Sequence, residues 1–137
     1  MATQLSSSDI SSLLNMIQCD QLDSANHMLR NKFETPSVEK IVDDLLCSGD
    51  VAFSRHHYRH AENFYRLAAV VAIHFGQHNL FQPLGAIHKL FLALQKQNDS
   101  SRIEEALNYF HQPILDIAQQ LNDENEIQIL SSGTIAS

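Results

Sequence analysis

The segment from Tyr58 to Phe75 is the part of this sequence that most constrains the fold. Apolar residues recur along it at alternating steps of three and four, the spacing of one face of an α-helix. Phe64, Leu67 and Val71 add a second apolar stripe, so most of the helix circumference is apolar. Such a helix is stable only when it is buried. The sequence therefore predicts a long central helix that other elements surround.

Residues that break regular structure are scarce, since the 137 residues include only 4 Gly and 3 Pro. Few turns favour long helices over the many short strands of a sandwich or barrel. The length suits one domain with its own core. We therefore predict an all-α protein with a flexible N-terminus over 1–8, a single domain over 9–130 and a flexible tail over 131–137.

Two short helices are predicted before the central one. Apolar residues at helical spacing run over 9–17 and again over 22–29, with a polar break at 19–21. Two helices joined by so short a connection pack antiparallel, which makes a helical hairpin.

A third helix is predicted to begin at Thr35-Pro36. Threonine caps the free amides of a helix start, and proline fits the first turn, where its missing N–H is not needed. Apolar residues continue at helical spacing as far as Phe53, so this helix should end near 55–57, directly before the central helix.

A last hairpin is predicted after a turn at 76–79. Its first helix has one apolar face, made by Leu80, Leu84, Ile87, Phe91 and Leu94. Its second helix opens with a capping box, in which Ser101 and Glu104 satisfy free amides reciprocally. The apolar face of that helix consists of Ile103, Ala106, Leu107 and Phe110. Pro113 should end or kink it, which leaves 114–130 to fold back as a cap or to pair with a second copy.

The middle of the chain carries small and aromatic residues at fixed intervals. The small residues that let two helices approach closely, and the aromatic ones that fill the space beside them, are Gly49, Ala61, Ala68, Tyr58 and Tyr65. In this respect the segment Gly49–Phe53 followed by Tyr58–Ala68 resembles a tetratricopeptide repeat, a helix–turn–helix unit of about 34 residues. Leu45 stands where that family usually has tryptophan, and Ile73 where it usually has proline.

Two segments on either side of the middle unit resemble the same repeat more weakly. The segments 22–29 and 103–110 are similar to the second helix of a tetratricopeptide unit. The resemblance implies antiparallel helical hairpins stacked in a right-handed array of about three helix pairs.

The resemblance also implies a binding groove, because in that family the first helix of each pair lines a concave surface that holds extended peptides. The positions that match the groove face are Asp43, Leu46, Cys47, Asp50 and Ser54. Two carboxylates above an apolar floor favour a basic or amphipathic segment as the ligand. The alternative is that Asp43 and Asp50 are ordinary surface charges.

A basic segment precedes and enters the central helix. Arg55, Arg59 and Arg66 are candidates for holding a phosphate or an acidic peptide near a helix start. The alternative is a solvated turn whose arginines pair with Glu62 or nearby aspartates. In the same segment His56 and His60 are four residues apart and are weak candidates for a metal pair, but no third protein ligand is evident.

Charge and motif content exclude several classes of function. A net charge of −7 and a pI near 5.5 argue against binding to nucleic acid or to anionic membranes. Nucleophile motifs and phosphate-binding glycine loops are absent, so we expect neither an enzyme nor a cofactor. Residues 1–12 lack the basic and apolar regions of a signal peptide, and Cys19 and Cys47 have no paired spacing. We therefore expect a cytoplasmic protein.

These observations predict a protein–protein interaction module: an adaptor, a small chaperone or a regulatory subunit that binds a peptide or protein segment in a helical groove. One alternative is a homo-oligomeric structural or regulatory protein, with a homodimer favoured because a short array has two ends that need cover. Another is a histidine-based sensor of a metal or small ligand.

Overall fold

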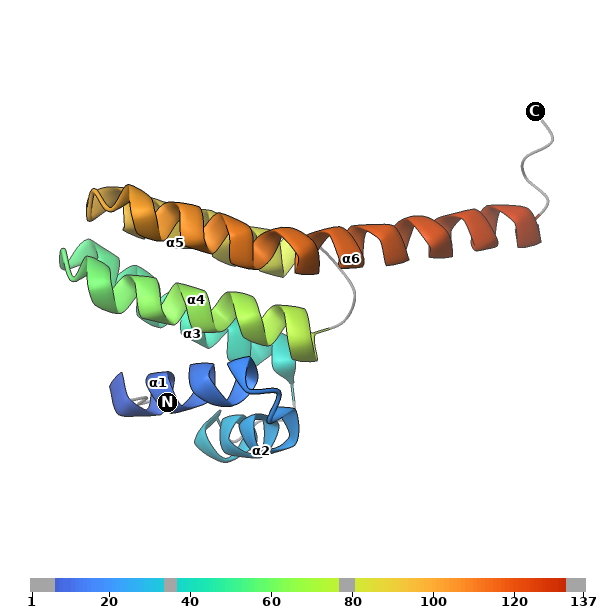
Figure 1. Cartoon of the computed structure of the whole chain (residues 1–137). Coiled ribbons are helices and arrows are strands. Elements are labelled where there is room, and N and C mark those ends of the chain that lie inside the picture. Colours follow the sequence, from blue (N-terminus) through green and yellow to red (C-terminus); the bar gives the residue numbers. More distant parts are fainter. Residues whose placement is uncertain (1–6, 34–36, 77–80, 133–137) are drawn as a thin grey trace.

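The computed structural model describes residues 7–33, 37–76 and 81–132, and these form six α-helices (Figure 1). The helices are α1 (Ser7–Gln18), α2 (Leu22–Phe33), α3 (Val38–Ser54), α4 (Tyr58–Phe75), α5 (Phe81–Lys96) and α6 (Ser100–Ser132). All regular structure in the described part of the chain is helical, which confirms the all-α prediction.

Helix α4 is the centre of the fold, as its apolar circumference predicts. It makes its most extensive contacts with α3 and α5 and also packs on α1. In Figure 1 it lies between the pair α5 and α6 on one side and α1 on the other. Ala61, Leu67, Ala68 and Val71 of α4 are fully buried, because neighbouring helices cover almost every side of it. Three further contacts, α1 with α2, α5 with α6, and α3 with α5, complete the packing around it.

The three short turns that join α1 to α2, α3 to α4 and α5 to α6 have one backbone feature in common. Each contains a residue with positive φ: Asp20 (61°), His56 (63°) and Asn98 (55°). At the end of α3 the N–H of His57 donates to the carbonyl of Ala52 at 2.9 Å, which is the six-to-one bond of a Schellman motif. Aspartate, asparagine and histidine tolerate the left-handed conformation better than most residues. These turns therefore do without the glycine that usually marks a helix end.

The start of α3 differs from the prediction. Ser37 is the N-cap, and its hydroxyl accepts a hydrogen bond from the backbone N–H of Lys40 at 3.2 Å. The helix therefore begins at Val38. Thr35 and Pro36, the predicted start, lie outside the described residues.

The start of α6 also differs from the prediction. The side chain of Asp99 accepts a hydrogen bond from the backbone N–H of Arg102 at 3.1 Å. The helix begins at Ser100, so Ser101 lies inside it and cannot be its cap. The predicted capping box is therefore wrong: aspartate two residues earlier provides the same stabilisation of a free amide.

Helix α6 continues through Pro113, so of the two predicted effects of this proline, ending the helix or kinking it, the first is wrong. Proline removes one intrahelical hydrogen bond, but the apolar face continues across it. Phe110 and Ile117 on either side are buried, and Ile114 packs against the core. Beyond the packed body, α6 projects away from the other helices (Figure 1). The expected fold-back of 114–130 as a cap is therefore wrong as well. Most of the predicted tail over 131–137 lies outside the described residues, which end at Ser132.

Candidate protein-binding site

The five positions predicted to line a groove lie on α3. Asp43, Cys47, Asp50 and Ser54 are exposed, and Leu46 is half-buried. Their spacing of three and four residues places them along one side of the helix. The opposite side of α3, with Ile41 and Leu45, is buried against the core. The helix thus presents the predicted positions together on one surface.

Two side chains of α5 extend this surface by bridging to α3. The Gln82 amide donates to the Asp43 carboxylate at 3.4 Å and to the backbone carbonyl of Glu39 at 3.2 Å. Seven residues further along each helix, the Lys89 ammonium contacts both carboxylate oxygens of Asp50, at 2.8 and 2.9 Å. These bridges connect the exposed Asp43 and Asp50 of α3 to the neighbouring helix α5.

Asp50 is therefore not a free negative charge. It forms an ion pair with Lys89 and also accepts a hydrogen bond from the Tyr65 hydroxyl at 2.6 Å. The ammonium group of Lys89 lies 5.9 Å from the centre of the Tyr65 ring. Burial, followed by the hydrogen bond to Asp50 and its charge, raises the pKa of Tyr65 well above its usual value. Of the two predicted groove carboxylates, only Asp43 lacks a cationic partner in the described part of the chain.

The exposed side of α5 carries three large apolar side chains together with His88. Phe81 is 90% exposed, Leu84 45% and Leu92 41%. Between them Gly85 is also exposed, and no atom lies within 4 Å of the position that a Cβ would take there. We call the exposed residues of the two helices the α3–α5 surface: Asp43, Leu46, Cys47, Asp50 and Ser54 of α3, and Phe81, Leu84 and Leu92 of α5.

The prediction that Leu84 belongs to the buried side of α5 is wrong. The buried side consists of Pro83, Ala86, Ile87, Leu90, Ala93 and Leu94. Phe81, Leu84 and Leu92 form a second stripe at helical spacing, with His88 between them, and the apolar pattern alone did not separate this stripe from the first. Leu107 of α6, predicted on a buried face, is likewise 53% exposed. Leu80 lies outside the described residues.

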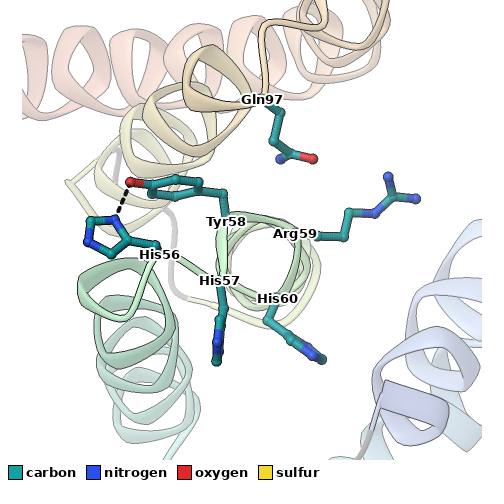
Figure 2. Close-up of a pocket in the computed structure, with 6 residues that line it drawn as sticks. All are labelled: His56, His57, Tyr58, Arg59, His60 and Gln97. Carbon is teal, nitrogen blue, oxygen red and sulfur yellow. Dashed lines mark hydrogen bonds between the residues drawn. The ribbon is translucent and has the colours of Figure 1, made fainter.

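The basic turn between α3 and α4 forms a shallow pocket of about 500 Å³ with Gln97 at its edge (Figure 2). His56 turns away from the other histidines, and its Nδ1 lies 2.7 Å from the Tyr58 hydroxyl. His57 and His60 point in the same general direction, with ring centres 6.3 Å apart. The structure therefore does not bring the predicted pair His56 and His60 together. No cluster of three metal-ligating side chains occurs among the described residues.

The predicted basic patch is divided in two. Arg55 and Arg59 are exposed at the turn, and neither forms an ion pair within the described part of the chain. Arg66 lies elsewhere, half-buried, with its guanidinium 3.3 Å from the carboxylate of Glu62. Arg66 is thus held in the interior by a buried carboxylate and is not available to a ligand at the turn.

Glu62 is the one fully buried charged side chain among the described residues, and sequence analysis did not identify it as such. Its Oε2 accepts from Arg66 and from Arg102 of α6, and its Oε1 accepts from the Gln97 amide at 2.9 Å. No buried side-chain nitrogen or oxygen in the described part of the chain lacks a partner. The cluster joins α4 to the end of α5 and the start of α6. Full burial of the Glu62 carboxylate is tolerated because both of its oxygens accept hydrogen bonds, two of them from arginines.

Comparison with known proteins leaves the chain without an assigned family. No model of a protein family matches it, and no curated protein or solved structure is significantly similar. The likeness to tetratricopeptide repeats therefore remains a resemblance of residues. In the described part of the chain, no helix has the length and apolar character required to cross a membrane.

Proposed function

We propose that this chain is a non-catalytic protein–protein interaction module of tetratricopeptide-like architecture, which binds an amphipathic segment of a partner protein along the α3–α5 surface. As an adaptor, small chaperone or regulatory subunit it would act by holding that segment. One observation carries the proposal. Three large apolar side chains, of which Phe81 is the most exposed, lie on the surface of α5, the helix that Lys89 connects to the predicted groove position Asp50 of α3.

The packing of α3, α4 and α5 supports the proposed architecture. Helix α4 packs on both α3 and α5, and α3 and α5 touch each other. In a tetratricopeptide array the first helices of successive pairs are neighbours and line the concave side. The main contact of α1 outside its own hairpin is with α4, whereas α3 and α5 contact each other. The proposed groove therefore consists of α3 and α5, the first helices of the second and third hairpins.

The chemistry of the surface supports an amphipathic ligand. Apolar side chains exposed in a group commonly mark an interaction site, and aromatic side chains supply much of the binding energy at such sites. Lys89 already neutralises Asp50, so the negative charge available to a ligand is that of Asp43. The ligand should therefore bury apolar residues on Phe81, Leu84 and Leu92 and place a basic residue near Asp43.

Selection of peptides from a random displayed library on the immobilised chain tests this function. Peptides that bind should carry apolar residues at regular spacing, with a basic residue beside them. Leu84→Arg should abolish their binding, whereas Leu107→Arg, an equally exposed leucine on α6, should leave it intact. Equal effects of the two substitutions, or an effect of neither, would refute the assignment of the site.

A homo-oligomeric regulatory protein is the second candidate, favoured by the projecting part of α6. An isolated helix of a few turns is only marginally stable in water, so it gains stability from a partner. Leu115 is 48% exposed near the beginning of this part. Light scattering over a range of concentrations should then give a dimer mass that Leu115→Asp reduces to that of a monomer. A monomer mass for the unaltered chain at all concentrations contradicts this second candidate.

A further inference from the structure

A cavity of about 250 Å³ lies between α1, α4 and α6. Two arginines, Arg66 of α4 and Arg102 of α6, line it, although the two residues are 36 positions apart in the sequence. Helix α1 contributes Leu14 and Gln18 to its wall. The cavity is separate from the α3–α5 surface, since no residue of α3 or α5 lines it.

The two arginines at this cavity outnumber the carboxylates that form ion pairs with them. Arg66 and Arg102 share a single carboxylate, that of the fully buried Glu62. The remaining partner of Glu62 is Gln97, which is neutral. Glu105 also lines the cavity, yet its carboxylate forms no ion pair with either arginine among the described residues. The two guanidinium groups therefore share one ion-pair partner, and Glu105 adds a second negative charge to the wall without pairing with either of them.

Both guanidinium groups have donors to spare. Each arginine carries five N–H groups in a planar fork that matches a carboxylate. Arg66 and Arg102 each use one nitrogen to contact Glu62, and their side chains remain 19% and 24% exposed. Because both guanidinium groups contact the buried Glu62 carboxylate, they are held in place without a ligand. This lowers the entropic cost of binding a ligand.

Apart from the two arginines, Gln18 and Glu105, the wall is apolar. Leu14 and Val70 line the cavity together with the ring of Tyr109, which packs edge-to-face on Phe110 at 4.8 Å. Ligand sites for drug-sized molecules occupy roughly 300–1,000 Å³, so this cavity suits a smaller group. A single apolar group beside one anion would match both parts of the wall.

We propose that this cavity binds a monocarboxylate carried on a small apolar group. The carboxylate would accept hydrogen bonds from the N–H groups of Arg66 and Arg102 that Glu62 leaves unused, while the apolar group would pack on Leu14, Val70 and Tyr109. A phosphate dianion fits less well, because its second charge would meet Glu105. The ligand is either a free organic acid or the C-terminal carboxylate of a peptide, which present the same chemistry.

Titration of the full chain with phenylacetate, followed by amide chemical shifts in NMR, tests this site. Saturable shifts should appear at Leu14, Val70 and Tyr109, and phenylacetamide, which lacks the charge, should not produce them. Inorganic phosphate should bind more weakly than phenylacetate. Absence of saturation with phenylacetate, or an equal response to its amide, would overturn the proposal.

Two exposed neighbours on α6 provide a matched pair of variants. Glu105 lines the cavity and Glu104 does not, and neither contacts Glu62. Glu105→Gln should tighten phenylacetate binding by about two- to fivefold, the effect of removing one exposed like charge. Glu104→Gln should not change it. An identical response of the two variants would show that binding is not at this cavity.

A peptide pair then distinguishes the two sources of the carboxylate. N-acetyl-glycyl-phenylalanine presents a C-terminal carboxylate on an apolar residue, and its C-terminal amide is the control. Tighter binding of this acid than of phenylacetate assigns the site to peptide termini, and weaker binding assigns it to free acids. If neither acid binds, the site proposal fails while the α3–α5 proposal is unaffected.

Discussion

Gly49 of α3 lies directly against the ring of Tyr65 of α4. A Cβ at Gly49 would fall 2.5 Å from Cε1 and 2.7 Å from Cδ1 of that ring, closer than any real contact. The missing side chain thus makes room for the aromatic ring, and the ring's hydroxyl in turn reaches Asp50 at 2.6 Å. Through Asp50 the same ring is connected to Lys89 of α5, so one glycine positions contacts among three helices.

Gly49→Ala should destabilise the fold by about 1–3 kcal/mol, because the added methyl group forces the Tyr65 ring or the helix pair to shift. Gly85→Ala is the matched control, since Gly85 is exposed in a helix and has open space around it. It should instead stabilise the fold by about 0.5–1 kcal/mol through the higher helix propensity of alanine. Urea unfolding measures both, and equal signs for the two substitutions would contradict the packing described here.

Ala61→Leu tests the close approach of α4 to its neighbours. Ala61 is fully buried, so three added heavy atoms have no space and should cost about 1–3 kcal/mol of unfolding free energy. Thermal unfolding followed by circular dichroism measures the effect. An unchanged melting temperature would contradict both the packing and the likeness to a tetratricopeptide unit.

Tyr65 predicts a loss of stability in alkaline solution. The usual tyrosine pKa of 10.0 applies to the unfolded chain, and burial with the Asp50 contact raises the pKa in the folded state. Above pH 10 the unfolded chain therefore releases a proton that the folded chain keeps, so this contribution is complete below pH 10 and decreases as the pH rises. Urea unfolding between roughly pH 9 and 11 should show a shallower decline for Tyr65→Phe. Tyr109→Phe, a substitution outside this contact, should keep the steeper decline.

Glu62→Gln should be strongly destabilising, although it preserves the shape of the side chain. The substitution leaves Arg66 and Arg102 at the interior without their carboxylate, and breaking a buried ion pair in this way costs about 3–5 kcal/mol. Glu104→Gln on the exposed side of α6 should stay within about 0.5 kcal/mol of the unaltered chain. A similar small change for both would show that the Glu62 cluster adds nothing to stability.

Much of the helical arrangement could be predicted from local patterns. The bounds of α4 follow from its apolar spacing, and the small residue at Gly49 together with Tyr65 indicated a close helix approach that the structure contains. The backbone conformation of the three tight turns could not be predicted. Asp20, His56 and Asn98 have positive φ, a conformation that a glycine in the sequence usually indicates. The caps of α3 and α6 were displaced by two residues or more, since several polar residues near a helix start can serve equally well.

The candidate surface could be predicted only in part. The exposed positions on α3 follow from their spacing, but the pairing of Asp50 with Lys89 joins residues 39 apart, and no local pattern encodes it. Leu84 and Leu107 can each be grouped with apolar residues at helical spacing on either of two faces of the helix. Which side is buried depends on where the next helix lies, so spacing alone placed both leucines wrongly.

The sequence by itself determined that the chain is all-α and that α4 is its centre. Both conclusions rest on local signals, the spacing of apolar residues and the scarcity of turn residues, which depend only on residues close together in the sequence. Tertiary structure decided the burial of Glu62, the continuation of α6 through Pro113 and the exposure of three large apolar side chains on α5. Each of these depends on contacts between helices that are distant in the sequence. A carboxylate can be buried only where two arginines meet it, and a proline can be accommodated where packing on both sides stabilises the helix that contains it.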